Sequence, residues 1–203
     1  MLMINWRLIM EHESMRVIVD EHSALSAMLR SLIMMIDRGS MEDRDQFFDV
    51  LRAMLFYVDE FPERLHHPKE STMFFPRVAL LAPHTRETIR QLDHDHAKGE
   101  ASVRELQHLL LAWELLGESR RLPFEQAARA YCRFYLEHMR LEEAIILPAA
   151  QNTLTELDWQ DLDDAFATNL DPLTQQSSRN PDFDLLFSRI VMQAPSPIGL
   201  GDA

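Results

Sequence analysis

Apolar residues recur at the three- and four-residue spacing of an α-helix along almost the whole chain, and most prolines and glycines fall between the long periodic segments. This pattern predicts an all-α protein. Because the connections between the segments are short or moderate, we expect an up-down-up-down four-helix bundle with short extra helices at the C-terminus. Only five glycines are present, and no glycine-rich phosphate loop or dinucleotide fingerprint occurs, which argues against a nucleotide-binding α/β fold.

Helix boundaries follow from capping residues. Ser14 is the predicted N-cap of the first long helix, and Gly39 and Gly117 fall just beyond the first and third. The second helix continues past Phe61 if Pro62 and Pro68 only kink it. The predicted ranges are 14–37, 41–61 with an extension toward 75, 83–116 and 123–148.

The chain divides into three predicted parts: an N-terminal apolar segment (1–13), a helical bundle (14–151) and an acidic C-terminal extension (152–203). In the first part, Ile4, Trp6 and Ile9 are expected to cover the bundle or to contact a second copy of the chain, as in a homodimer. The extension is expected to hold short helices over 154–169 and 183–192, followed by a loose tail over 193–203.

Charge and composition exclude several classes of binding partner. The formal net charge is −13, with 20 Lys and Arg against 33 Asp and Glu, so nucleic acid is not an expected partner. No apolar run is long enough to span a bilayer, and the chain does not start like a signal peptide, so we expect a cytoplasmic protein without a membrane partner. The single cysteine, Cys132, excludes a cysteine-rich metal site, which leaves nitrogen and oxygen ligands for any metal.

Each predicted long helix directs one histidine toward its apolar face when residues are placed about 100° apart around the helix axis. These inward histidines are His22, His66, His96 and His138. The same construction places His67 about 100° and His94 about 160° away from the inward direction. Tyr131 and Tyr135, at helical spacing on the fourth helix, are assigned to the core rather than to radical chemistry.

A glutamate follows three of these histidines by four residues, which places it on the same helix face. These glutamates are Glu70, Glu100 and Glu142. A single inward histidine is usually an ordinary core residue. Four buried imidazoles with buried carboxylates would be costly without partners, and a bound metal removes that cost. The combination therefore predicts a metal centre.

The donor set indicates which metal. Four imidazoles and two carboxylates are too many donors for one tetrahedral zinc ion, and the mixed nitrogen and oxygen ligands suit a pair of iron ions, with manganese or zinc as alternatives. If Glu70 and Glu142 both bridge two six-coordinate ions, and a bridging oxygen is shared, one coordination position stays open on each ion.

Four segments, in order, carry a family resemblance: DEHSAL around His22, LHHPKESTMFFP around His66, LDHDHAKGE around His96 and YLEHMRLEEAIILP around His138. Over residues 17–151 the chain resembles the hemerythrin family, specifically the bacterial His-His-Glu (HHE) cation-binding domains. The resemblance implies a hemerythrin-like bundle with a non-haem di-iron centre and an oxo or hydroxo bridge. It implies the metal ligands His22, His66, Glu70, His96, His138 and Glu142.

The sequence departs from oxygen-carrying members of this family at two positions. These members have a second ligating histidine where this chain has Leu92, and an aspartate five residues after the last histidine, where this chain has Glu142 at four. The missing imidazole argues against reversible oxygen carriage, and Glu100 is an alternative occupant of the free position. The pattern is closer to di-iron proteins implicated in iron-sulfur cluster repair and nitric oxide responses.

The sequence therefore predicts a cytoplasmic di-iron protein that binds or reacts with a small oxidant such as O2, peroxide or nitric oxide, in a stress response or in iron-sulfur cluster repair. The expected partner is a small diatomic or anionic ligand. The alternative is a non-catalytic iron sensor or store, in which the acidic segment 155–184 signals to a protein partner. Turnover distinguishes the two, and the sequence does not decide whether the protein is an enzyme.

Overall fold

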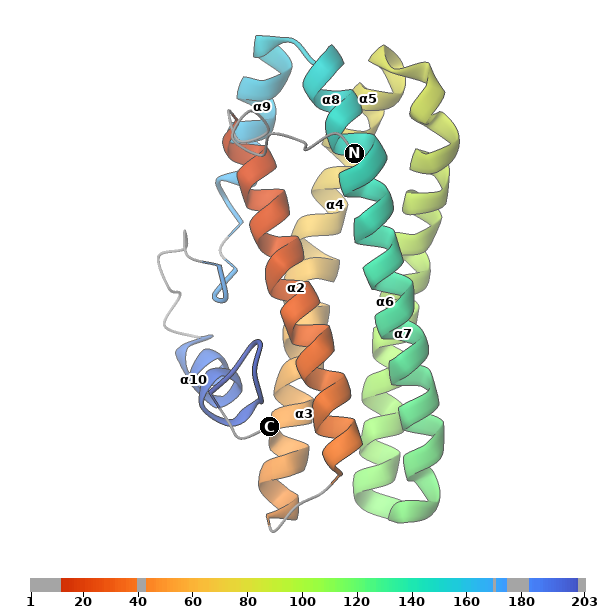
Figure 1. Cartoon of the computed structure of the whole chain (residues 1–203), viewed down its shortest axis with the longest axis vertical. Coiled ribbons are helices and arrows are strands. Elements are labelled where there is room, and N and C mark those ends of the chain that lie inside the picture. The colour runs from red at the N-terminus through yellow and green to blue at the C-terminus, as the bar shows by residue number, and fades with distance from the viewer. Residues whose placement is uncertain (1–11, 40–42, 170, 175–182, 201–203) are drawn as a thin grey trace, which may run out of the picture.

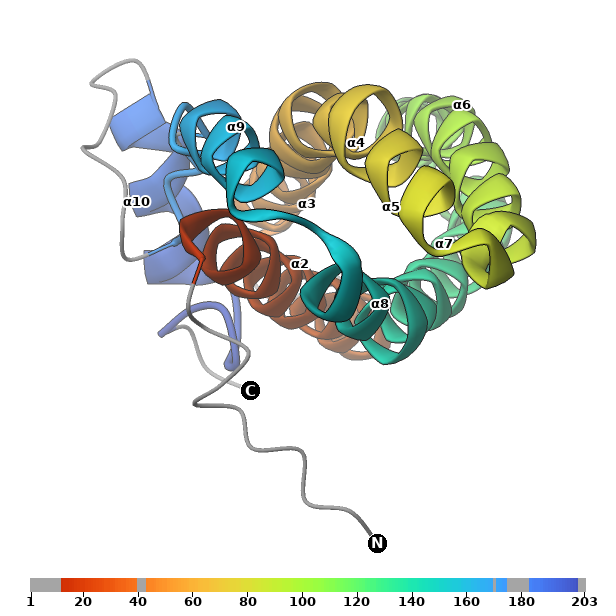
Figure 2. The same ribbon diagram turned by 90° about the horizontal axis from the view of Figure 1, so that it is seen from above.

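The computed structural model describes residues 12–39, 43–169, 171–174 and 183–200. In this part of the chain the regular elements are helices, and four long helical rods run side by side, alternating in direction (Figure 1). Seen along the bundle, the rods surround a common axis (Figure 2). The predicted all-α four-helix bundle is therefore confirmed. The rods are α2 (Glu13–Arg38), α3 (Arg44–Val58) continuing to α5 (Phe75–Leu81), α6 (Arg86–Leu116), and α7 (Arg121–Leu141) continuing to α8 (Leu147–Thr153).

Several helix ends follow the capping signals in the sequence. Asp43 caps α3, where its side chain accepts a hydrogen bond from the backbone N–H of Gln46 at 2.9 Å. Gly39 and Gly117 end α2 and α6 with φ values of 73° and 87°, a region that favours glycine. The N-cap prediction for Ser14 is wrong. Its hydroxyl donates to Asp163 at 2.6 Å, so this side chain joins two helices instead of capping its own.

Wide π-helical turns interrupt the second and fourth rods. In the second rod, Asp59–His66 and Glu70–Phe74 are π-helical and flank α4 (His67–Lys69). Proline lacks the backbone N–H of a regular helix, and the wider turns let the rod pass both Pro62 and Pro68 and continue to Leu81. The fourth rod has a similar segment at 142–146 and also runs beyond its predicted end, because Pro148 begins α8 instead of ending the helix.

Two apolar clusters fill the bundle, one on each side of a polar layer. On α2, Ile18 belongs to one cluster and Leu25 to the other, and His22 lies between them. On α6, Leu92 and Val103 belong to different clusters and enclose His96 in the same way. The polar layer is therefore buried inside the bundle, with apolar packing on both sides.

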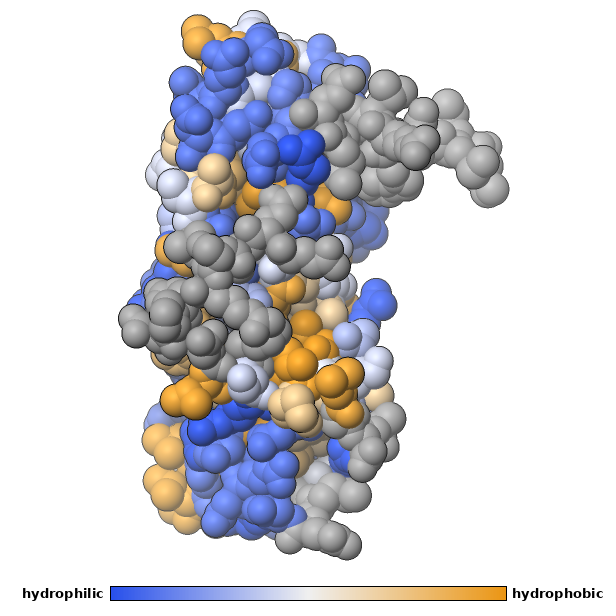
Figure 3. All heavy atoms as spheres, turned by 90° about the vertical axis from the view of Figure 1, so that its left-hand side faces the viewer, coloured by the Kyte–Doolittle hydropathy of each residue, from blue (hydrophilic) through white to orange (hydrophobic). Residues whose placement is uncertain are grey.

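The C-terminal extension lies outside the bundle (Figure 2). It contains the two predicted short helices: α9 (Glu156–Phe166), which packs on α2, and α10 (Asp184–Gln193), which packs on α3. Thr155 and Asp158 form a capping box at the start of α9. Figure 3 views this side of the molecule, where hydrophobic residues gather at mid-height among those coloured and hydrophilic residues dominate toward both ends.

The predicted loose tail is wrong for residues 194–200. Ala194 is buried, and the hydroxyl of Ser31 donates to the carbonyl of Pro195 at 2.8 Å and accepts from the backbone N–H of Ile198 at 3.1 Å. This buried serine attaches the segment to α2. The predicted apolar segment with Ile4, Trp6 and Ile9 lies outside the described residues. Over the described ranges, no helix has the length and apolar character needed to cross a membrane.

Candidate metal centre

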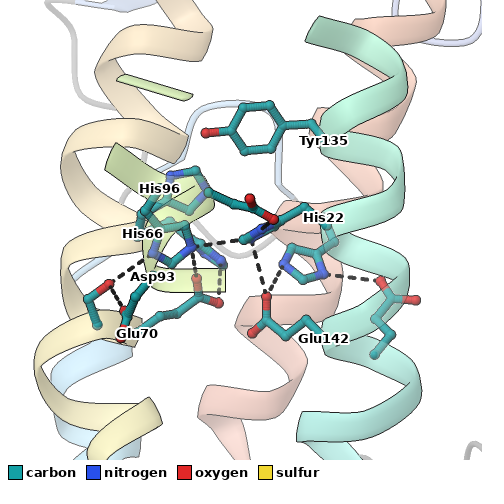
Figure 4. A network of polar contacts seen from close by, with 12 residues as sticks. His22, His66, Glu70, Asp93, His96, Tyr135 and Glu142 are labelled. Atoms are coloured by element: carbon teal, nitrogen blue, oxygen red, sulfur yellow. Dashed lines mark hydrogen bonds and ion pairs between the residues drawn. The ribbon is translucent and has the colours of Figure 1, made fainter. Parts of the chain in front are cut away.

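The structure brings all six predicted ligands together in the polar layer. Each is at most 7% exposed. Figure 4 shows five of them, labelled, converging from different rods onto one region inside the bundle. The six are His22 from α2, His66 and Glu70 from the second rod, His96 from α6, and His138 and Glu142 from the fourth rod.

Each carboxylate lies between two imidazoles. Glu70 Oε1 is 2.7 Å from His66 Nε2, and Glu70 Oε2 is 3.3 Å from His96 Nε2. Glu142 Oε2 is 3.4 Å from His22 Nε2 and 3.9 Å from Nε2 of His138. The Nε2 atoms therefore point at the two carboxylates from four directions, an arrangement that suits shared, bridging carboxylates.

The two carboxylates lack hydrogen bonds. Both oxygens of Glu70 and of Glu142, together with His66 Nε2, are buried without a partner in hydrogen-bonding geometry. Leaving a buried polar atom unpaired costs about 1–3 kcal/mol, and more for a charged group. Several such atoms at one place fit a bound cation, which would satisfy them together.

The pKa values of the two carboxylates also fit a bound cation. Burial opposes ionisation of Glu70, but the neighbouring His66 holds its pKa well below the ordinary value. Burial and the charge of Glu70 raise the pKa of Glu142 to about 7. Burial alone would lower the pKa of His22, but Glu142 raises it to about 9. The two carboxylates are therefore difficult to ionise together unless positive charge lies between them.

The outward ring nitrogens of His22, His66 and His96 have hydrogen-bond partners of their own, which fix the direction of these rings, and the outward nitrogen of His138 faces a carboxylate at a longer distance. Each of these partners precedes or follows a predicted ligand by one residue in the sequence. The contacts are His22 Nδ1 to Glu143 at 3.1 Å, His66 Nδ1 to Glu21 at 2.6 Å, His96 Nδ1 to Ser71 at 2.9 Å, and His138 Nδ1 to Asp95 at 3.7 Å. Apolar periodicity does not reveal these partners, because they are polar residues outside the apolar stripes of the helices.

Comparison with protein families gives a match over residues 10–150 to the family described as the hemerythrin HHE cation binding domain. The chain belongs to this hemerythrin family. No curated protein matches the chain. Hemerythrin-family membership and the buried histidine and glutamate cluster together indicate that the protein binds a cation.

Two groups of donors can each hold an ion in this hemerythrin domain. Their members each offer one ligand atom, and within a group these atoms lie within 4.8 Å of one another. Glu70 belongs to both groups. Among the residues that the structure describes, one group consists of His22, His66 and Glu70. The other consists of His67, Glu70, His96 and His138.

The outward prediction for His67 is wrong. Its side chain is 4% exposed and lies in the centre of the hemerythrin bundle. The prediction assumed a constant angle per residue, whereas the π-helical segment Asp59–His66 changes that angle immediately before His67. As a result, both His66 and His67 face inward. Pro62, inside an otherwise periodic helix, was the available sequence signal for such a change.

Unlike His67, the side chains of His94 and Glu100 lie at the surface. His94 is exposed, as predicted. Glu100 is also exposed, and it accepts a hydrogen bond from Arg104 at 2.5 Å, which turns it away from the centre. The alternative in which Glu100 supplies another ligand is therefore wrong. Of the three glutamates that follow a histidine by four residues, only Glu70 and Glu142 reach the hemerythrin centre.

Proposed function

We propose that this protein is a non-haem di-iron protein that binds or reacts with a small oxidant such as O2, peroxide or nitric oxide. The observation that carries the proposal is the pair of buried carboxylates, Glu70 and Glu142, each placed between two imidazoles and lacking hydrogen bonds. Two iron ions at this position would supply one- and two-electron redox chemistry toward the oxidant. The ligands in this proposal are His22, His66, Glu70, His96, His138 and Glu142.

A small cavity beside the donors supports a ligand of diatomic size. Its volume is about 10 Å³, close to the space that one water-sized molecule needs. Such a volume excludes a larger organic substrate at this position. The cavity is lined by Glu21, His22, Leu25, Phe61, Pro62, His66, His67 and Asp171.

Charge favours a small anionic ligand as well. Two divalent ions with the two carboxylates of Glu70 and Glu142 leave a local charge of about +2. The chain as a whole carries −13, so this positive charge is confined to the buried centre. Nucleic acid and membranes are not partners in this proposal, and a homodimer stays a prediction.

The test is metal analysis combined with optical spectroscopy. Protein purified without air is expected to contain two iron ions per chain, and its spectrum is expected to change on addition of O2 or nitric oxide. His66→Ala is expected to lose most of the iron, while His94→Ala, changed at an exposed position near His96, keeps it. One ion per chain with full reactivity would refute the bridging roles, and two zinc or manganese ions would replace iron in the proposal.

A second candidate, an iron sensor or store, is favoured by one specific chain of contacts. Glu21 contacts His66 Nδ1 at 2.6 Å and also accepts a hydrogen bond from Asn169 at 2.9 Å. Asn169 follows α9, so the donor group is connected to the C-terminal extension. In a sensor, iron loading is expected to change hydrogen exchange in this extension without turnover. Consumption of many oxidant molecules per protein would instead favour an enzyme.

A further inference from the structure

His67 is a buried imidazole that the six-ligand assignment does not use. Its ring lies parallel to the ring of His96, with centroids 4.2 Å apart and an interplanar angle of 13°. On Tyr135 it stacks at 5.5 Å and 5°. Contacts with two nearly parallel rings restrict rotation of the His67 side chain, so its nitrogens point in fixed directions.

Glu63 determines which of these nitrogens is free. Glu63 Oε2 lies 3.1 Å from His67 Nδ1, and Oε1 accepts hydrogen bonds from Tyr135 at 2.6 Å and from Tyr131 at 3.0 Å. A carboxylate with both oxygens engaged accepts the proton on Nδ1 of a neutral imidazole. That hydrogen bond leaves Nε2 with its lone pair available as a ligand atom.

Gly99 makes room for this network. A Cβ atom at this position would lie 1.7 Å from the Tyr135 hydroxyl oxygen and 2.9 Å from Glu63 Oε1. The tyrosine hydroxyl therefore sits against the backbone of α6, where any larger residue would displace it. The hydrogen bonds that hold Glu63 depend on this close approach.

We propose that His67 is a seventh protein ligand of the metal centre, binding through Nε2, and that Glu63 positions it. His67 offers a ligand atom within 4.8 Å of ligand atoms on Glu70, His96 and His138. The carboxylate, imidazole and metal then form the arrangement that commonly orients histidine ligands. The inference rests on the proposed function, because it adds a residue to the same centre.

The proposal makes the two ions unequal. One ion has three imidazoles, from His67, His96 and His138, and the other has two, from His22 and His66, while the carboxylates are shared. The open coordination position therefore belongs to the ion on the His22 and His66 side. The cavity of about 10 Å³ is lined by His22 and His66 and also by His67, so a small ligand in it would lie beside donors of both ions.

The experiment uses the full chain loaded with Mössbauer-active iron. In the unchanged protein we expect two iron sites with different quadrupole splittings. In His67→Ala we expect one of the two signals to shift while the other is preserved, and the affinity for one ion to fall by about tenfold or more. His94→Ala is the matched control, because His94 is exposed on α6 and should leave both signals unchanged.

Rescue by free imidazole distinguishes a role of His67 as a metal ligand from a role in packing. His67→Gly leaves a space that free imidazole can occupy, and we expect added imidazole to return the shifted signal to its original position. Glu63→Gln keeps an acceptor for Nδ1 but removes the charge, so it should shift the same signal by a smaller amount. If His67→Ala fails to fold, the Mössbauer spectrum of His67→Gln tests in its place whether His67 is a ligand.

The outcomes distinguish this inference from the proposed function. Two ions per chain with signals that His67→Ala and His67→Gln leave unchanged would refute His67 as a ligand, while the di-iron proposal would stand. A chain that binds no iron, with or without His67, would refute the proposed function itself. A shifted signal in folded His67→Gly that added imidazole does not return to its original position would show that His67 is a packing residue and not a ligand.

Discussion

At the scale of single residues, Gly99 shows how an absent side chain determines the position of a polar network. Gly99→Ala is expected to destabilise the fold by about 1–3 kcal/mol, because a Cβ atom would overlap the hydroxyl oxygen of Tyr135, which lies 1.7 Å from the Cβ position. Urea denaturation of the two proteins measures the difference.

The double variant Gly99→Ala with Tyr135→Phe is the control for this prediction. Removing the hydroxyl removes the overlap, so the double variant should regain part of the lost stability despite losing the hydrogen bond to Glu63. If the effects of the two substitutions on the free energy of unfolding simply add, the cost of Gly99→Ala does not come from overlap with the Tyr135 hydroxyl, and the tyrosine can move aside.

At the scale of helical elements, the π-helical segment Asp59–His66 sets the angle of everything that follows it in the rod. Deleting Glu60 is expected to rotate the following residues by roughly a quarter of a turn, since each residue of a helix contributes an angle of about that size. His66, His67 and Glu70 would then leave the centre. We expect most of the bound metal to be lost, with helix content preserved, as measured by elemental analysis and circular dichroism.

An insertion in a turn is the control for the deletion. One alanine added after Gly117, between α6 and α7, changes the chain length by the same amount without altering the angle within a rod that carries ligands. This variant should keep its metal. Equal loss of metal in both variants would mean that the centre responds to any change in length, and not to helix angle.

The same element shows where sequence reasoning succeeds and where it fails. Regular helices α2 and α6 obey a constant angle per residue, so the inward positions of His22 and His96 and the outward position of His94 follow from spacing alone. His67 follows a wide turn, and its burial depends on an angle that apolar periodicity does not reveal. Ser14 fails for another reason, because its hydrogen bond to α9 is a tertiary contact that outweighs local capping.

At the scale of the whole molecule, the polar layer is expected to make the stability of the bundle depend on metal. Removal of the ions is expected to lower the melting temperature, because ions that bind only the folded chain stabilise it and because buried carboxylates lose their partners. Thermal denaturation with and without a chelator measures the effect. An unchanged melting temperature would mean that the donors do not hold a strongly bound cation.

Cys132 provides an internal probe for the same experiment. Its side chain is 4% exposed, and burial raises the pKa of the thiol to about 12, so in the folded protein it should react very slowly with alkylating reagents. Chelation should speed its labelling if metal removal loosens the bundle as a whole. A lower melting temperature without faster labelling would mean that metal removal loosens the other side of the polar layer, away from the cluster that contains Cys132.

Glu70 belongs to both groups of donors, and that sharing affects how the centre fills. The first ion to bind would fix a carboxylate that the second ion also needs, so the entropy of ordering that side chain is lost only once. Filling should therefore be cooperative. A population supplied with half the metal it can hold would then consist mostly of empty and fully loaded molecules, with few half-loaded ones.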